Sequence, residues 1–89
     1  MTWTIKFEEK ALKQFKKLDK SIQKKISNYL RDKIEIPNDP YLFAKNLGGD
    51  KFGLVRYRIE NYRVIAEIIE DELVVLALRI DHRKDVYNY

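Results

Sequence analysis

The strongest constraint on the fold lies in residues 55–69, where apolar and polar side chains alternate on both sides of Glu60-Asn61. Alternation with a period of two is typical of strands with one buried face. A two-residue loop at Glu60-Asn61 would join the two strands as a hairpin, because asparagine tolerates the positive φ angles of such turns. The predicted apolar face contains Val55, Tyr57, Ile59, Tyr62, Val64, Ala66 and Ile68.

Arginines occupy the other face of this predicted hairpin. Its register places Arg58 directly opposite Arg63, and Arg56 lies on the same face. Two like charges that face each other across a strand pair are destabilising. Folding alone does not favour that pair, so we expect an anionic partner on this face.

A further strand is predicted over residues 73–80, the most apolar segment of the chain. A two-residue turn before it would bury Arg79, and an unpaired buried charge is costly. We therefore favour a three-residue turn at residues 70–72. That turn directs Val74, Leu76, Leu78 and Ile80 to the core, and Leu73, Val75, Ala77, Arg79, Asp81 and Arg83 to the arginine face.

The first half of the chain predicts one strand and two helices. Trp3, Ile5 and Phe7 alternate with polar residues, as in a half-buried strand. Two apolar stripes with helical spacing follow. They consist of Ala11, Leu12, Phe15 and Leu18, and then of Ile22, Ile26, Tyr29, Leu30 and Ile34. Pro37 ends the second helix, since proline disfavours helix at the residue before it, and residues 38–50 form a connector rich in turn residues.

These elements predict an α+β fold with the order β-α-α-β-β-β in a single domain, residues 1–89. The N-terminal strand and the helical hairpin would pack on one face of a mainly antiparallel four-stranded sheet. The first strand joins the core most simply if it lies beside the last. The other face of the sheet would carry the arginines.

Composition narrows the classes of function. The chain has 18 basic and 14 acidic residues, and a net charge of +4 favours a polyanionic or acidic partner. It has no cysteine and one histidine, so we expect neither a metal site nor a cofactor. No apolar run approaches the roughly 20 residues of a membrane helix, and no secretion signal is recognisable. We therefore expect a cytoplasmic protein that does not enter a membrane.

Three segments, in this order, carry a resemblance to a known family. They are F-E-E-K-A-L-K-Q-F-K-K-L-D from Phe7, R-Y-R-I-E-N-Y-R-V-I-A-E from Arg56, and L-V-V-L-A-L-R-I-D-H-R-K-D-V-Y from Leu73. The chain resembles the RelE/ParE superfamily of type II toxin–antitoxin toxins, and more specifically its RelE-like branch. The resemblance implies a compact toxin that a cognate antitoxin holds inactive. RelE-like members enter the ribosomal A site and cut mRNA, whereas ParE-like members poison DNA gyrase.

The resemblance also implies catalytic roles for individual residues. Arg56 matches a basic residue implicated in proton transfer or phosphate contact. Arg63 matches the arginine that binds the scissile phosphate, and Arg83 matches a second phosphate ligand. Tyr87 matches a C-terminal tyrosine that stacks on a base or orients the nucleophile. Leu54 departs from the pattern, because some members have lysine there, and one cationic group is therefore missing.

Metal-independent cleavage of RNA fits these residue types. The RNA 2′-hydroxyl attacks the adjacent phosphate, so the enzyme must stabilise phosphate charge and manage two protons. Arginine binds phosphate oxygens bidentately, but a guanidinium does not give up its proton. We expect further RNA contacts at Arg58, His82, Lys84 and Tyr89. Among these, His82 is of the residue type that most often moves protons near neutral pH, and Tyr89 is able to stack on a base.

The expected function is therefore a ribosome-dependent mRNA endonuclease with an antitoxin, the ribosome and mRNA as partners. Two alternatives remain open at this point. One is a ParE-like gyrase inhibitor, which binds without doing chemistry. The other is a non-catalytic member that only binds its antitoxin. The clustered arginines and the H-R…V-Y ending favour the endonuclease.

Overall fold

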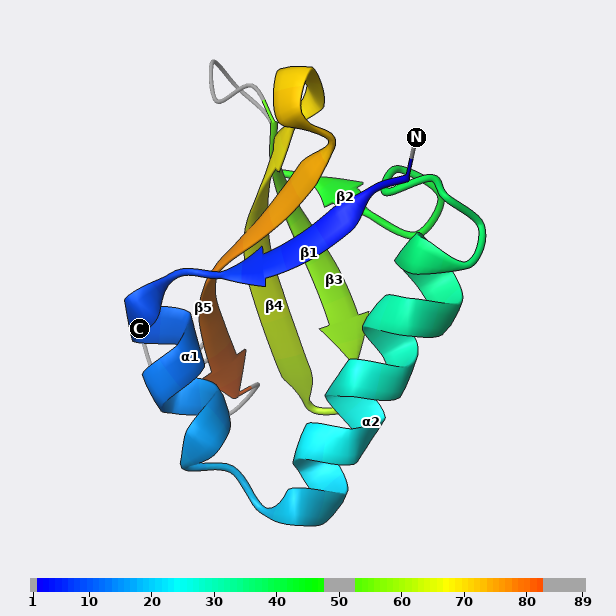
Figure 1. The fold of residues 1–89 in the computed structure, drawn as a ribbon. Coiled ribbons are helices and arrows are strands. Elements are labelled where there is room, and N and C mark those ends of the chain that lie inside the picture. Colours follow the sequence, from blue (N-terminus) through cyan, green and yellow to red (C-terminus); the bar gives the residue numbers. More distant parts are fainter. Residues whose placement is uncertain (1, 48–52, 83–89) are drawn as a thin grey trace.

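The computed structural model describes residues 2–47 and 53–82. In chain order its elements are β1 (Thr4–Phe7), α1 (Glu9–Lys16), α2 (Lys20–Leu30), a π-helical turn (Arg31–Glu35), β2 (Lys45–Asn46), β3 (Leu54–Ile59), β4 (Tyr62–Ile69), a 3₁₀ turn (Glu70–Glu72) and β5 (Val74–His82). Figure 1 shows α1 and α2 on one side of a twisted sheet, with α1 near β5 and α2 near β3. None of the described helices is long and apolar enough to cross a membrane. The predicted α+β class is confirmed.

The sheet has one strand more than the sequence predicted. Within the described ranges its order is β1-β5-β4-β3-β2, with β1 parallel to β5 and the other neighbours antiparallel. The predicted place of the first strand beside the last is confirmed. The additional strand is β2, which lies in the segment predicted only as a connector. Two residues are too short to show a period of two, and pairing with the edge of β3 makes them a strand.

The core lies between the helices and one face of the sheet. The helical part contributes Ala11, Ile26, Leu30 and Ile34, and the β3–β4 hairpin contributes Val55, Tyr57, Ile59, Val64, Ala66 and Ile68. The predicted apolar face of the hairpin is therefore confirmed, with Tyr62 packed against its edge. Leu12 was expected in the stripe of α1, but 38% of its surface is exposed. In the short α1, Ala11 occupies the position that faces the core.

The hairpin register also agrees with the prediction. Ile59 pairs with Tyr62 and Arg58 with Arg63 across a two-residue turn. The positive φ angle of the turn, 54°, belongs to Glu60 and not to Asn61, the residue for which it was predicted.

The predicted facing of β5 is wrong in the first half of that strand. Val75 and Ala77 are buried in the core, whereas Leu76 and Leu78 are half-buried. The loop before β5 comprises residues 70–73 rather than 70–72, because Ile69 pairs with Val74. A β-bulge then leaves Leu78 without a partner, since Ala66 pairs with Ala77 but the preceding Ile65 pairs with Arg79. Beyond the bulge, Arg79 and Asp81 lie on the arginine face and Ile80 lies in the core, as predicted.

Gly53 determines how β3 begins. Its φ angle is +79°, and a Cβ atom at this position would lie 2.9 Å from the carbonyl oxygen of Ile68. We predict that Gly53→Ala lowers the free energy of unfolding by about 2 kcal/mol, because the left-handed backbone alone costs an L-residue roughly 1–2 kcal/mol. Urea denaturation measures the loss. Lys24→Ala, on the exposed side of α2, is the control, and an equal change in both variants would contradict the prediction.

Candidate nucleic-acid interface

The sheet face opposite α1 and α2, here called the outer face, carries two rows of charged side chains. One row runs across four strands and contains Lys45, Arg56, Ile65 and Arg79. The second row contains Arg58, Arg63 and Asp81. Residues directly opposite each other share a face, with Cβ atoms about 4.5–5.5 Å apart. Together Lys45, Arg56, Arg58, Arg63 and Arg79 form what we call the basic face.

Asp81 changes the electrostatic balance of the second row. It lies directly opposite Arg63, and its Oδ2 atom is 2.9 Å from Nε of Arg79. The predicted pairing of Arg58 with Arg63 is confirmed, but this like-charge pair has a carboxylate beside it. The row with Lys45 and Arg56 contains no acidic residue. The stronger electrostatic argument for an anionic ligand therefore applies to that first row.

Arg56 has hydrogen-bonding capacity that the described part of the chain does not use. Its side chain is half-buried, and its Nε atom is buried without a hydrogen-bond partner among the residues described. Buried polar groups in proteins are nearly always hydrogen-bonded. A guanidinium that is not fully hydrogen-bonded is suited to a ligand with acceptor oxygens, such as a phosphate.

Arg58 lies at the margin of the basic face rather than at its centre. It borders a groove of 390 Å³ between the hairpin and α2, together with Lys25, Asn28, Tyr29, Ile59 and Glu60. An ion pair of 3.1 Å between Lys25 Nζ and Glu60 Oε2 lies beside this groove. Arg58 is exposed, so it is accessible to a long ligand that extends past Arg63 toward α2.

His82 is not brought to the basic face. It lies opposite Tyr62, which packs against the core, so both side chains belong to the helix-facing side of the sheet. The two rings are perpendicular, with centroids 4.9 Å apart. The other predicted site residues of the tail, Arg83, Lys84, Tyr87 and Tyr89, lie outside the described residues. The described ranges contain no cluster of three His, Cys, Asp or Glu residues that could hold a metal.

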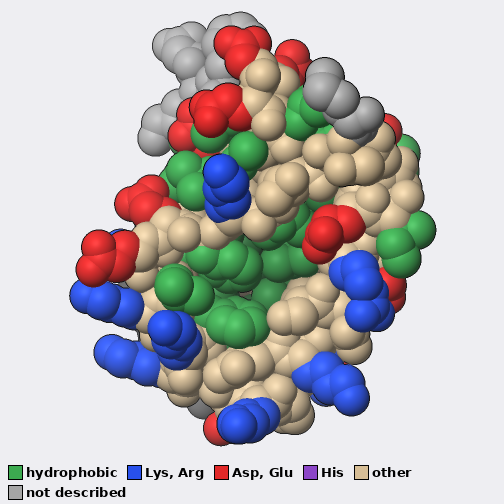
Figure 2. All heavy atoms as spheres, viewed as in Figure 1, with side chains coloured by type: hydrophobic (Ala, Val, Ile, Leu, Met, Phe, Trp, Pro, Cys, Tyr) green, Lys and Arg blue, Asp and Glu red, His purple; other side chains and the backbone are tan. Residues whose placement is uncertain are grey.

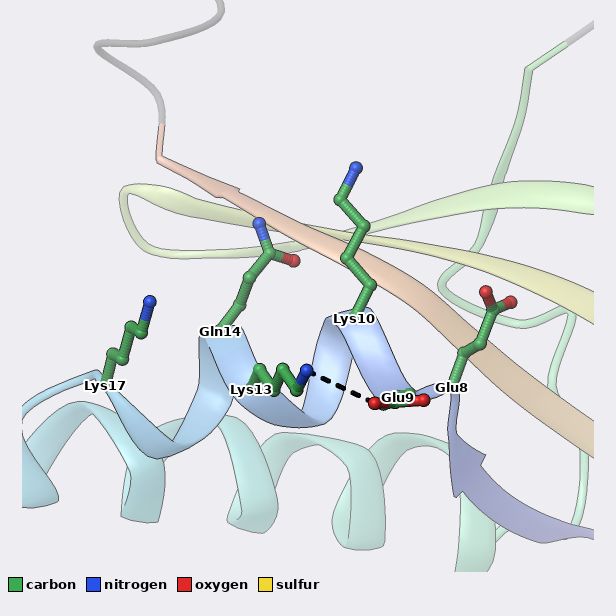
Figure 3. A pocket seen from close by; sticks show the side chains of 6 residues that line it. All are labelled: Glu8, Glu9, Lys10, Lys13, Gln14 and Lys17. Atoms are coloured by element: carbon green, nitrogen blue, oxygen red, sulfur yellow. Dashed lines mark ion pairs between the residues drawn. The ribbon is translucent and has the colours of Figure 1, made fainter.

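Two other surface features lie away from the basic face. Figure 3 shows a groove along α1 lined by Glu8, Glu9, Lys10, Lys13, Gln14 and Lys17. Lys13 pairs with Glu9 at 3.2 Å in an exposed position, and such pairs contribute little to stability. Figure 2 shows an apolar hollow on the helix side; between β1 and α2 it is lined by Ile5, Phe7, Ser27, Leu30 and Glu35. The groove along α1 holds three lysines, but two glutamates line it as well, so neither feature combines cations without nearby acids as the row of Lys45 and Arg56 does.

Comparisons with known proteins agree on one family. Residues 5–87 match the family model of the ParE toxin of type II toxin–antitoxin systems. A RelE-like toxin protein of Escherichia coli is 31% identical over 99% of this chain and 93% of its own. The mRNA interferase toxin RelE of Escherichia coli K12 is 26% identical over the same shares of the two chains.

Solved structures show the same fold. The RelBE2 toxin–antitoxin complex of Mycobacterium tuberculosis superposes with a TM-score of 0.79 at 24% identity, covering 93% of each chain. The archaeal RelE–RelB complex of Pyrococcus horikoshii gives a TM-score of 0.72 at 27% identity, covering 93% of this chain and 97% of the other. This chain therefore belongs to the RelE/ParE superfamily of type II toxin–antitoxin toxins, in its RelE-like branch.

Proposed function

We propose that this protein is a ribosome-dependent endoribonuclease that cuts mRNA in the A site and thereby inhibits translation. The observation that carries the proposal is the basic face, where Arg56 and Arg63 lie in adjacent rows of one sheet surface. Planar guanidinium groups match the spacing of phosphate oxygens and bind them bidentately. The names of related proteins, including the mRNA interferase toxin RelE of Escherichia coli K12, support the same activity.

In the proposed reaction the RNA provides its own nucleophile. The 2′-oxygen forms a bond to phosphorus, the bond from phosphorus to the 5′-oxygen breaks, and the products are a 2′,3′-cyclic phosphate and a 5′-hydroxyl. The proton of the 2′-hydroxyl leaves to a base, and an acid protonates the departing 5′-oxygen. Arg63 and Arg83 bind the scissile phosphate and stabilise its growing negative charge. Arg56 adds a phosphate contact, since a guanidinium does not accept or release the proton.

The remaining predicted residues act in substrate binding under this proposal. Tyr87 and Tyr89 stack on unpaired bases, for which aromatic side chains are suited, and Arg58 and Lys84 contact the RNA backbone. His82 contributes only at the edge of the sheet, because the structure directs it away from the basic face.

A cognate antitoxin is the proposed regulatory partner, and a ribosomal target places the protein in the cytoplasm. Several related structures are complexes of a RelE toxin with its antitoxin. The net charge of +4 favours a partner segment with acidic residues. Such a segment would neutralise the basic face and exclude RNA from it.

The direct test is mapping of 5′ ends of message in a translating extract. We predict new ends within the codon at the A site for the wild-type protein and at least a hundredfold slower cleavage for Arg83→Ala, since loss of one charge-stabilising donor typically costs 10²–10³ in rate. Arg31→Ala is the control, because Arg31 lies on the π-helical turn and pairs with Asp32 at 3.0 Å.

The same experiment distinguishes the proposed endonuclease from a gyrase inhibitor, the alternative that the ParE family model suggests. A gyrase inhibitor would leave message intact and would accumulate cleaved DNA–gyrase complexes in cells. Growth arrest with that pattern would refute the endonuclease proposal.

A further inference from the structure

We propose that Lys45 is a phosphate-binding residue of the basic face, where it supplies the cation that Leu54 does not. The proposal deepens the endonuclease function and rests on it. Nothing in the sequence around Lys45 marks it, because it lies in a short connector between turn residues. The sheet pairing is what brings it to Arg56.

The position of Lys45 follows from the register of β2 and β3. Lys45 pairs directly with Arg56, so the two Cβ atoms lie about 4.5–5.5 Å apart on the same face. Leu54 is two residues from Arg56 along β3, a separation of roughly 6.6 Å. Lys45 is therefore at least as near to Arg56 as a lysine at position 54 would be. Its side chain is exposed, which leaves the ammonium group accessible to a ligand.

The charges around Lys45 indicate what that ligand is. Lys45 and Arg56 are like charges in direct opposition, which opposes folding. Their row contains no acid, and Arg79 at its far end is paired with Asp81. Glu67 lies on the same face, opposite Leu54. Within the described ranges it forms no ion pair with Lys45 or Arg56.

A phosphate group between Lys45 and Arg56 accounts for the like-charge pair and for the unsatisfied guanidinium of Arg56. It neutralises the like-charge pair, and its oxygens accept from the guanidinium of the half-buried Arg56, whose Nε atom has no hydrogen-bond partner in the described structure. Lysine offers three N–H donors to the same group. The RNA backbone then runs from Arg63 toward the β2 edge of the sheet, with a second phosphate held by this pair.

The chain offers a matched control in Lys6. It is an exposed lysine on β1, the opposite edge strand, and it pairs with Leu76. Since Ile5 and Phe7 pack against the core, Lys6 lies on the outer face as Lys45 does. It differs in one respect that matters, because no arginine lies opposite it.

The experiment compares cleavage rates of message in a translating extract for wild type, Lys45→Gln, Lys45→Arg and Lys6→Gln. We expect Lys45→Gln to cleave roughly tenfold more slowly, as for loss of one charged hydrogen bond. Lys45→Arg should restore most of the rate, and Lys6→Gln should match wild type. The salt dependence should also weaken in Lys45→Gln, by about 0.7 in the log–log slope for one phosphate contact to a single strand.

Lys45→Glu separates a role in binding from a role in folding. It places a carboxylate opposite Arg56, so the variant should melt at a higher temperature than wild type and yet cleave more slowly than Lys45→Gln. A lower melting temperature together with slower cleavage would assign Lys45 a purely structural role and overturn the proposal. So would wild-type rates in Lys45→Gln, which would leave the endonuclease function intact. Wild-type protein that cuts no message would instead refute the endonuclease function, and this inference with it.

Discussion

Arg63→Ala should lower the rate of mRNA cleavage by at least about a hundredfold without destabilising the protein. Arg63 lies between Arg58 and Asp81 in the second row of the basic face, where its guanidinium is positioned to stabilise charge on the scissile phosphate. Its removal relieves the like-charge contact with Arg58 but also takes away the cation opposite Asp81. Because these two effects oppose each other, we expect the melting temperature to stay within a few degrees of that of wild type. Mapped 5′ ends in a translating extract measure the rate.

Arg63→Lys tests whether the shape of the guanidinium matters beyond its charge. Lysine keeps the positive charge but loses the bidentate fork, so its rate should fall between those of wild type and Arg63→Ala. A cleavage rate in Arg63→Ala equal to that of wild type would exclude Arg63 from the reaction. A large loss of stability in that variant would mean that the slower rate reports unfolding.

Tyr57→Ala should remove a large part of the stability of the fold, about 3–5 kcal/mol, as for other truncated core aromatics. Tyr57 is fully buried, and its ring meets that of Tyr29 edge to face at 6.5 Å. The free energy of unfolding of a small domain is only about 5–15 kcal/mol in total. Urea denaturation should therefore show an early or absent transition.

Tyr57→Phe isolates the hydroxyl group of this residue. The hydroxyl donates a hydrogen bond of 2.5 Å to the carbonyl oxygen of Pro40, and burial raises the pKa of Tyr57. The variant should lose about 1–3 kcal/mol, because the carbonyl is left without that donor. Tyr41→Phe is the matched control. The hydroxyl of Tyr41 also donates a hydrogen bond, to Glu70, but Tyr41 is 48% exposed, so water replaces the lost partner and stability should change by less than about 0.5 kcal/mol. Equal losses in the two variants would contradict this account of the core.

The contrast between the β3–β4 hairpin and β5 shows where sequence reasoning succeeds. In the hairpin, the two-residue turn and strict alternation together determine every pair, so Arg58 was correctly placed opposite Arg63. In β5, alternation predicted the wrong facing for the first residues, because the turn before the strand is one residue longer than expected. The β-bulge at Leu78 was not predicted either. A β-bulge changes the facing of all residues beyond it, and it is visible only in the hydrogen bonds to the neighbouring strand.

The residues of the candidate site were likewise predicted only in part from the sequence. Arg56, Arg58 and Arg63 lie within one hairpin, and local alternation was enough to gather them. Asp81 was also predicted on this face, but its place opposite Arg63 comes from the pairing of β4 with β5, and the place of Lys45 opposite Arg56 comes from the pairing of β2 with β3. His82 was expected among the RNA contacts, but its place one residue after Asp81 turns it to the other side of the sheet.

The sequence by itself determined the fold class, the hairpin with its arginine face and the family, because these depend on local periodicity and on motifs in a fixed order. Alternation also predicted Arg79 and Asp81 on the arginine face, and only the tertiary structure decided which charges lie opposite each other there. The partners of Arg56 and Arg63, namely Lys45 and Asp81, are set by hydrogen-bond register between separate strands. That register depends on loop length, on a bulge and on the packing of the core beneath the sheet, and none of these has a period that a single strand displays.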